Sequence, residues 1–153
     1  MLKQSLIFVV LILFSLSTPA EPPASAIDWS SVAQIARQHQ SPILVVFSAD
    51  SCSYCVRLKE EIIDPLSQDT SGDQNILIRE FDINAGGKII DFDGDATRSR
   101  QFKRRYGVYA TPTLLILDAD GRLLSEPIVG YNSAPEYQEL LNASLVSSLE
   151  ALE

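Results

Sequence analysis

The order of the predicted helices and strands indicates an α/β fold, with a mixed central β-sheet that is flanked by helices on both faces. Two observations lead to this prediction. A strand, a helix and a second strand follow one another early in the chain, and such a crossover makes the two strands parallel. Two later strands are joined by a short turn, which makes them antiparallel. The length of 153 residues suggests one domain, which is long enough to bury a core without metals or disulfide staples.

The N-terminal segment has the pattern of a secretory signal peptide. Lys3 precedes an uncharged apolar run over residues 6–16, and small residues and prolines follow. We expect a signal peptide over residues 1–20, with residue 26 as the latest cleavage point, and one domain over residues 27–153. The apolar run is too short to span a bilayer comfortably, so we expect an exported, periplasmic protein with no stable membrane span after cleavage. An uncleaved N-terminal membrane anchor remains the alternative.

The domain begins with a helix that is followed by a central strand. Asp28 is a suitable cap for a helix that runs to about residue 39, and Pro42 ends the helical pattern. Residues 43–47 (ILVVF) form a continuous apolar run that is rich in β-branched side chains. Such a run is typical of a strand that is buried on both faces in the middle of a sheet.

The predicted crossover follows this strand. A helix is expected from Cys52 to about Asp64, where Pro65 interrupts it. A polar loop then covers residues 67–75, and residues 76–83 read as the second strand.

The segment after the second strand is the least regular part of the domain. Residues 84–96 contain three glycines and several aspartates, so we expect an irregular excursion or a small hairpin. Thr97 is a candidate cap for a helix that ends near Tyr106, with Gly107 as the glycine that closes its C-terminus.

The C-terminal part reads as a hairpin followed by a helix. Strands are expected over residues 113–117 and 123–129, joined by a turn at residues 118–121 (DADG). Residues 134–152 form an amphipathic helix. Its predicted apolar stripe consists of Tyr137, Leu140, Leu141, Leu145, Val146 and Leu149.

The only two cysteines of the chain, Cys52 and Cys55, are predicted to form one redox centre. Cys52 lies where the buried strand turns into a helix, and the unpaired N–H groups and positive dipole of a helix N-terminus favour a thiolate. Cys55 lies three residues further on, deeper on the same face of the helix. It is therefore positioned to attack a mixed disulfide that forms at Cys52.

Two other interpretations of the cysteine pair are weaker. A zinc site needs about four ligands, and the only histidine, His39, falls on a different helix, so we expect no metal. A purely structural disulfide would close a very small loop and would constrain the unfolded chain little. The position of the pair after a buried strand and at a helix start favours redox activity.

The cysteine pair and a later proline together resemble a known family. The order of elements, the C-x-x-C motif after a buried strand and the Thr111-Pro112 step look like the thioredoxin superfamily, over about residues 28–152. The similarity is greatest to exported thioredoxin-related proteins with a C-x-Y-C centre, which is Cys52-Ser53-Tyr54-Cys55 here. Supporting stretches are residues 110–113 (ATPT), and residues 118–121 followed by Gly130-Tyr131.

The resemblance implies a thioredoxin fold and assigns roles to three further residues. It implies a cis peptide bond before Pro112, which would lie against the cysteines and present the Thr111 backbone to an extended substrate segment. Tyr54 resembles the central residue of glutaredoxin and disulfide-isomerase centres, and its simplest role is to pack over the sulfurs. The cysteine pair itself takes the place of a cofactor.

The chain also departs from thioredoxins in ways that bear on mechanism. Thioredoxins carry Trp before the first cysteine and Gly-Pro between the two, whereas this chain has Ser51, Ser53 and Tyr54. Thioredoxins bury an aspartate where this chain has Val46. Another group or water must therefore accept the proton of the second cysteine. Glu80 is a candidate, although a solvated strand residue is the favoured interpretation.

We therefore expect a thiol–disulfide oxidoreductase that acts on protein disulfides outside the cytoplasm, with Cys52 as the nucleophile and Cys55 as the resolving thiol. A reductase is the first choice, and it would need a membrane or soluble electron donor. A disulfide oxidase or isomerase and a non-catalytic peptide-binding module remain open. The formal net charge of −8 argues against nucleic acid as the main partner.

Two groups of charged residues have simpler interpretations. Asp91, Asp93 and Asp95 resemble calcium ligands, but the glycine is misplaced and no Glu follows at the required distance, so a solvated loop is expected. A basic helix face is expected to be solvated too, with an acidic partner as the alternative. This face consists of Arg98, Arg100, Lys103, Arg104 and Arg105.

Overall fold

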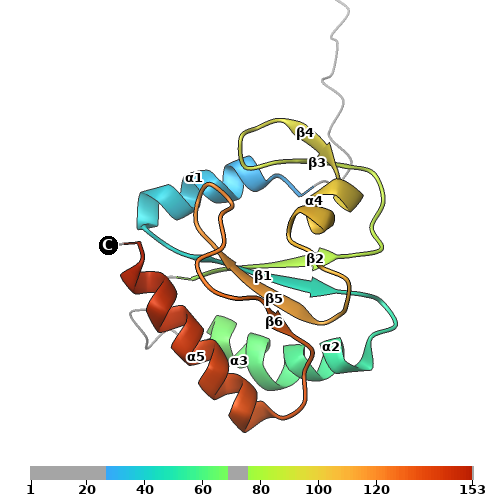
Figure 1. The fold of residues 1–153 in the computed structure, drawn as a ribbon, viewed down its shortest axis with the longest axis vertical. Coiled ribbons are helices and arrows are strands. Elements are labelled where there is room, and N and C mark those ends of the chain that lie inside the picture. Colours follow the sequence, from blue (N-terminus) through green and yellow to red (C-terminus); the bar gives the residue numbers. More distant parts are fainter. Residues whose placement is uncertain (1–26, 69–75, 153) are drawn as a thin grey trace, which may run out of the picture.

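The computed structural model describes residues 27–68 and 76–152, which build a four-stranded sheet in the order β2-β1-β5-β6 (Figure 1). The central strand β1 (Ile43–Ser48) pairs in parallel with β2 (Leu77–Asp82). On its other side β1 pairs antiparallel with β5 (Thr113–Leu117), which pairs antiparallel with the short β6 (Ile128–Val129). The predicted mixed sheet, its crossover and its antiparallel pair are confirmed.

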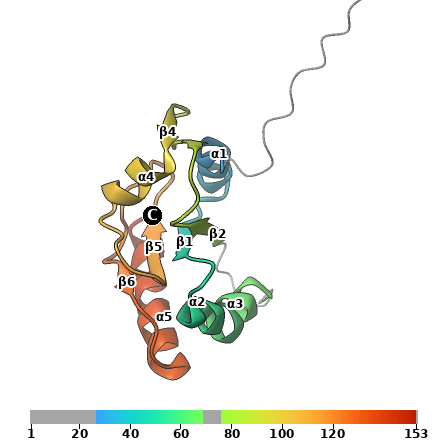
Figure 2. The same cartoon turned by 90° about the vertical axis from the view of Figure 1, so that its right-hand side faces the viewer.

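One face of the sheet carries the segments that precede β1 and follow β2. They are α1 (Trp29–His39), the hairpin of β3 (Lys88–Ile90) and β4 (Ala96–Arg98), and α4 (Ser99–Arg105). Figures 1 and 2 show these elements together on one side of the sheet. The predicted small hairpin is therefore present.

The other face is covered by the helix that carries the cysteines and by the C-terminal helix (Figure 2). The first consists of α2 (Ser53–Leu58), the π-helical turn η1 (Lys59–Ile63) and α3 (Asp64–Gln68). The second is α5 (Ala134–Glu150). Helices thus cover both faces, as the fold class requires.

Residues 43–47 of the central strand are apolar because the strand contributes to two cores. Successive side chains of a strand point to opposite faces. Val45 and Phe47 belong to the core under α1 and α4, whereas Leu44 and Val46 belong to the core under α2 and α5. All residues of β1 are buried.

The core under α1 is dominated by aromatic rings. The fully buried Trp29 stacks on Phe102 at 5.0 Å and on Phe92 at 5.4 Å between ring centroids. Phe81 lies 5.2 Å from both Phe102 and Phe47. Offset rings at such distances contribute about 0.5–1.5 kcal/mol per pair beyond the area that they bury. These contacts join α1 and α4 to the sheet.

The cysteine helix does not end at Pro65, contrary to the sequence-based prediction. The chain stays helical to Gln68 because the turn before the proline is widened to a π-helix. The N–H of Asp64 donates to the carbonyl of Lys59, five residues earlier. A proline lacks an N–H and its ring clashes with the carbonyl four residues before it in a regular α-helix. The wider turn accommodates both effects.

Two further boundaries and the apolar stripe of α5 differ from the sequence-based expectation. Thr97 pairs with Ile89 inside the hairpin, so α4 begins only at Ser99, although Gly107 follows it with φ +63° as predicted. Residues 123–127 touch β5 at an isolated bridge instead of forming a strand, and β6 starts after Pro127, which has no N–H to donate. In α5, Ser148 is buried. Leu140 and Val146, which were predicted to be in the apolar stripe, are about half exposed.

Within residues 27–68 and 76–152, no helix has the length and apolar character needed to cross a membrane. The predicted signal peptide over residues 1–20, its alternative end at residue 26 and most of the predicted polar loop lie outside the described residues.

Candidate active site

The cysteine pair lies at the start of α2, directly after the carboxyl end of β1. The Cys52 N–H donates to the carbonyl of Ala49, which closes the short loop after the strand. Cys52 is the N-cap residue, and its Sγ accepts a hydrogen bond from the Cys55 N–H at 3.1 Å. The sulfur thus takes the place of the oxygen that usually caps a helix, where a negative charge is stabilised.

Cys52 and Cys55 form a disulfide, with 5.2 Å between their Cα atoms. The two residues differ in exposure, since Cys52 is partly exposed whereas Cys55 is only 8% exposed. Cys55 faces inward with Leu58, one turn further along the helix, which is fully buried. An incoming molecule therefore meets Cys52 first.

The predicted cis peptide bond between Thr111 and Pro112 is present. Thr113 pairs with Phe47 in the antiparallel register, so the Thr111-Pro112 step lies at the same edge of the sheet as the end of β1 and the cysteine loop (Figure 1). Pro112 is buried and Thr111 is partly exposed. The Pro112 carbonyl accepts from the Gly130 N–H at 2.8 Å, which fixes the loop against the chain that follows β6.

Tyr54 lies on α2 between the two cysteines and is 55% exposed. More than half of its surface therefore faces solvent in the oxidised protein. This exposure leaves the ring available for contact with an incoming chain, and its expected packing over the sulfurs stays a prediction.

Glu80 lies on β2, and its carboxylate contacts two side chains. Its Oε1 accepts from the Ser48 hydroxyl at 2.8 Å, and its Oε2 pairs with Lys59 Nζ at 3.2 Å. Its side chain is 51% exposed, which agrees with the favoured interpretation of a solvated strand residue. Val46, the residue that pairs with Glu80 in the parallel register, is buried among apolar side chains.

A cluster that sequence reasoning did not find joins the cysteine helix to the loop after β6. The Tyr131 hydroxyl donates to Glu61 Oε2, Arg57 Nε donates to Glu61 Oε1 at 3.1 Å, and the Arg57 guanidinium lies 5.3 Å from the centre of the Tyr131 ring. The hydrogen bond from Tyr131 lowers the pKa of Glu61; burial opposes this effect, and Arg57 adds to it. The i,i+4 spacing of Arg57 and Glu61 was a visible signal, but nothing local pointed to Tyr131.

The expectation of a solvated aspartate loop is wrong for Asp91. This residue is 4% exposed and forms a two-point ion pair with Arg105, whose side chain remains 47% exposed. Asp93 instead accepts from the Asp95 N–H at 2.9 Å in an exposed turn. Within the described part of the chain, no three His, Cys, Asp or Glu side chains are grouped in a way that would hold a metal.

The comparisons with known proteins agree with this geometry. The family model described as Thioredoxin-like domain matches residues 30–145, and the chain therefore belongs to the thioredoxin-like family. No curated protein sequence matches the chain.

Solved structures share the fold at low sequence identity. A thioredoxin-fold protein from Helicobacter pylori is 19% identical, with a TM-score of 0.50 over 73% of this chain and 81% of its own. A mutant thioredoxin from Halobacterium salinarum NRC-1 is 20% identical, with a TM-score of 0.51 over 78% of this chain and 88% of its own. These similarities bear on the fold alone.

Proposed function

We propose that this protein is a thiol–disulfide oxidoreductase that reduces protein disulfides outside the cytoplasm. The observation that carries the proposal is the unequal exposure of the two sulfur-bearing residues at a helix start. Cys52 is open to a substrate and stabilised as a thiolate by the helix N-terminus, whereas Cys55 is buried behind it.

In the proposed reaction, the thiolate of Cys52 attacks one sulfur of the substrate disulfide. The substrate S–S bond breaks, its other sulfur leaves as a thiolate that takes up a proton, and a mixed disulfide forms at Cys52. Cys55 gives its proton to water and attacks the Cys52 sulfur. This step forms the Cys52–Cys55 disulfide, breaks the mixed disulfide and releases the second substrate sulfur as a thiolate that takes up a proton. Two electrons pass to the substrate, and a membrane or soluble dithiol donor must return them.

Neighbouring residues would position the substrate. We propose that an extended substrate segment lies along the partly exposed Thr111, next to the buried Pro112, and that the exposed ring of Tyr54 contacts it. In this reaction the cysteine pair takes the place of a cofactor, as the resemblance implied. The apolar run near the N-terminus supports a periplasmic location, with an N-terminally anchored form as the alternative.

The test is the equilibrium reduction potential of the cysteine pair, combined with two serine variants. A reductase predicts a potential near that of thioredoxin, about −270 mV. Cys52→Ser should abolish the reduction of a protein disulfide. Cys55→Ser should instead accumulate a mixed disulfide with the substrate, since the second attack is lost.

Other outcomes would replace the proposal. A potential near about −120 mV would indicate an oxidant that donates disulfides. A potential below about −300 mV, with no mixed disulfide in Cys55→Ser, would indicate a structural disulfide in a peptide-binding module.

A further inference from the structure

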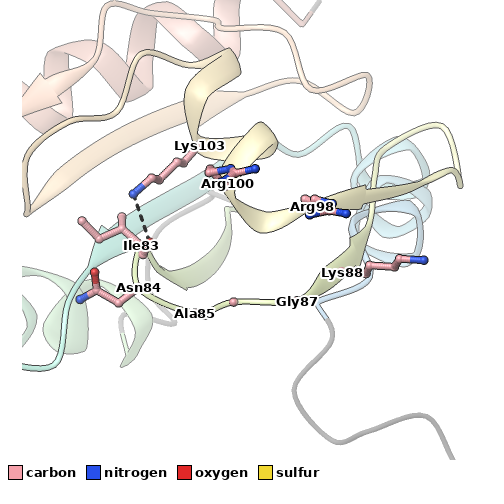
Figure 3. Close-up of a pocket in the computed structure, with 9 residues that line it drawn as sticks. Ile83, Asn84, Ala85, Gly87, Lys88, Arg98, Arg100 and Lys103 are labelled. Atoms are coloured by element: carbon pink, nitrogen blue, oxygen red, sulfur yellow. Dashed lines mark hydrogen bonds between the residues drawn. The ribbon is translucent and has the colours of Figure 1, made fainter.

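A groove of about 530 Å³ lies beside the carboxyl end of β2, and most of its charged lining is basic (Figure 3). One side is the segment 83–87, which leads from β2 to the hairpin. The other side is formed by residues of β4 and α4, which follow one another along the groove in Figure 3. The basic side chains that line it are Lys88, Arg98, Arg100 and Lys103.

The groove begins at the edge of the sheet that carries the cysteines. The N–H of Ile83, the first lining residue, donates to the carbonyl of Ser48 at 2.9 Å, and Ser48 ends the strand that leads to Cys52. A second hollow of about 410 Å³ shares Arg100 and Lys103 with the groove and extends to Tyr109. Tyr109 is 85% exposed and lies two residues before Thr111. The basic surface therefore continues from the groove as far as Tyr109, close in sequence to the cis-proline step.

The charge of this surface is opposite to that of the whole chain. Residues 83–112 carry six basic and three acidic side chains, whereas the chain has 12 basic and 20 acidic ones. Of the three acidic residues, Asp91 is already paired with Arg105. Among the described residues, Lys88, Arg98, Arg100 and Arg104 form no ion pair. Lys103 donates to the carbonyl of Ile83 and forms no ion pair there either.

We propose that this groove binds an acidic polypeptide segment next to the disulfide of the client protein. The proposal rests on the proposed redox function and specifies its substrate class. An extended chain suits the site because the second hollow ends at Tyr109, two residues before Thr111, where the substrate segment is expected to lie. The wall at Gly86 and Gly87 also leaves open space, since an added Cβ at either would meet nothing within 4 Å.

We expect the groove to raise the rate at which the acidic client associates with the protein, more than the stability of the resulting complex. Single exposed ion pairs contribute little, because water and salt screen them. Several unpaired cations on one path instead raise the association rate of an oppositely charged partner, by a factor of about 10 or more at low salt. The preference should therefore appear in kcat/KM and should fall as the salt concentration rises.

The test uses two disulfide-bonded peptides that differ only in the residues on one side of the reactive cysteine, four glutamates against four glutamines. At low salt we expect kcat/KM for the acidic peptide to be about 10-fold higher. The double variant Arg98→Gln/Arg100→Gln should remove most of this preference. The control Arg37→Gln/Arg122→Gln makes the same change in net charge away from the groove and should keep it.

Two additional measurements separate this proposal from the redox function. The neutral 2-hydroxyethyl disulfide reports redox activity that does not depend on the groove. If this disulfide is reduced normally but the two peptides are reduced at equal rates, the groove proposal is refuted and the redox proposal stands. If no disulfide is reduced, a titration of the oxidised protein with a cysteine-free tetraglutamate peptide still tests whether the groove binds an acidic segment. Salt-sensitive NMR shifts at Arg98 and Arg100 support the groove, and shifts spread evenly over the surface refute it.

Discussion

Asp91 is the one charged side chain, among the described residues, that the fold buries. Burial opposes its ionisation, but the hydrogen bonds from Arg105 and from the Phe92 N–H, together with the charge of Arg105, outweigh this cost and lower its pKa. Its folded pKa therefore lies below the unfolded value of about 3.9. The pair contributes stability above that value, and this contribution is lost as the pH falls through the folded pKa.

We predict that Asp91→Asn lowers the free energy of unfolding by about 1–3 kcal/mol at pH 7, because the buried carboxylate is lost and Arg105, whose side chain is 47% exposed, loses its charged partner. Chemical denaturation from pH 7 to pH 2.5 should show that the difference in unfolding free energy between the original protein and the variant shrinks below about pH 4. Asp93→Asn is the matched control, since Asp93 is exposed in the same hairpin, and it should change little. A difference that stays constant down to pH 2.5 would contradict the ion pair.

At the scale of elements, the turn between β5 and the following chain depends on one glycine. Gly121 has φ +75°, and its N–H donates to the carbonyl of Asp118. A Cβ at this position would lie 2.5 Å from the ring of Phe92, which stacks on Trp29. The turn therefore needs glycine for its backbone and also for its contact with the aromatic core.

We predict that Gly121→Ala destabilises the protein more than Gly130→Ala does. Gly130 has φ +82° but would meet nothing within 4 Å, so its substitution measures the left-handed strain alone, about 1–2 kcal/mol. Gly121→Ala should add about 1–3 kcal/mol, because the Phe92 ring must move. Thermal unfolding of both variants is the measurement, and equal losses would show that the ring moves at no cost.

At the scale of the whole molecule, the sheet separates two hydrophobic cores, and only one of them contains side chains of the cysteine helix. Trp29 belongs to the core under α1, whereas Leu58 of the cysteine helix belongs to the core on the opposite face. A change in a core alters the reduction potential only if it affects the oxidised and reduced proteins unequally.

We predict that Trp29→Leu lowers the free energy of unfolding by about 2–4 kcal/mol and leaves the reduction potential within about 10 mV of its original value. If about 3 kcal/mol fell on one redox state alone, the potential would move by about 65 mV. Leu58→Ala is the comparison on the cysteine helix and should move both quantities. Denaturation in both redox states and glutathione equilibration provide the measurements, and a large shift in Trp29→Leu would show that the two cores are coupled.

The features that depend on chain order and local pattern could be predicted from the amino-acid sequence. Residues 43–47 are apolar at every position, which is typical of a strand with a core on each side, and this indicated the centre of the sheet. The crossover implied parallel pairing, and the cysteine spacing implied a pair at a helix start. These predictions are confirmed because neighbouring residues and the handedness of the crossover connection are enough to specify the features.

The features that depend on residues far apart in the chain became apparent only in the folded structure. The partner of Asp91 is 14 residues away and that of Glu61 is 70 residues away, so local pattern did not show that either pair forms. The helix passes Pro65 because a wider turn keeps its apolar face on the sheet. The basic residues of β3, β4 and α4 became a groove because the edge of the sheet carries segment 83–87 beside them. Such outcomes follow from packing between distant segments, which no local pattern of the sequence specifies.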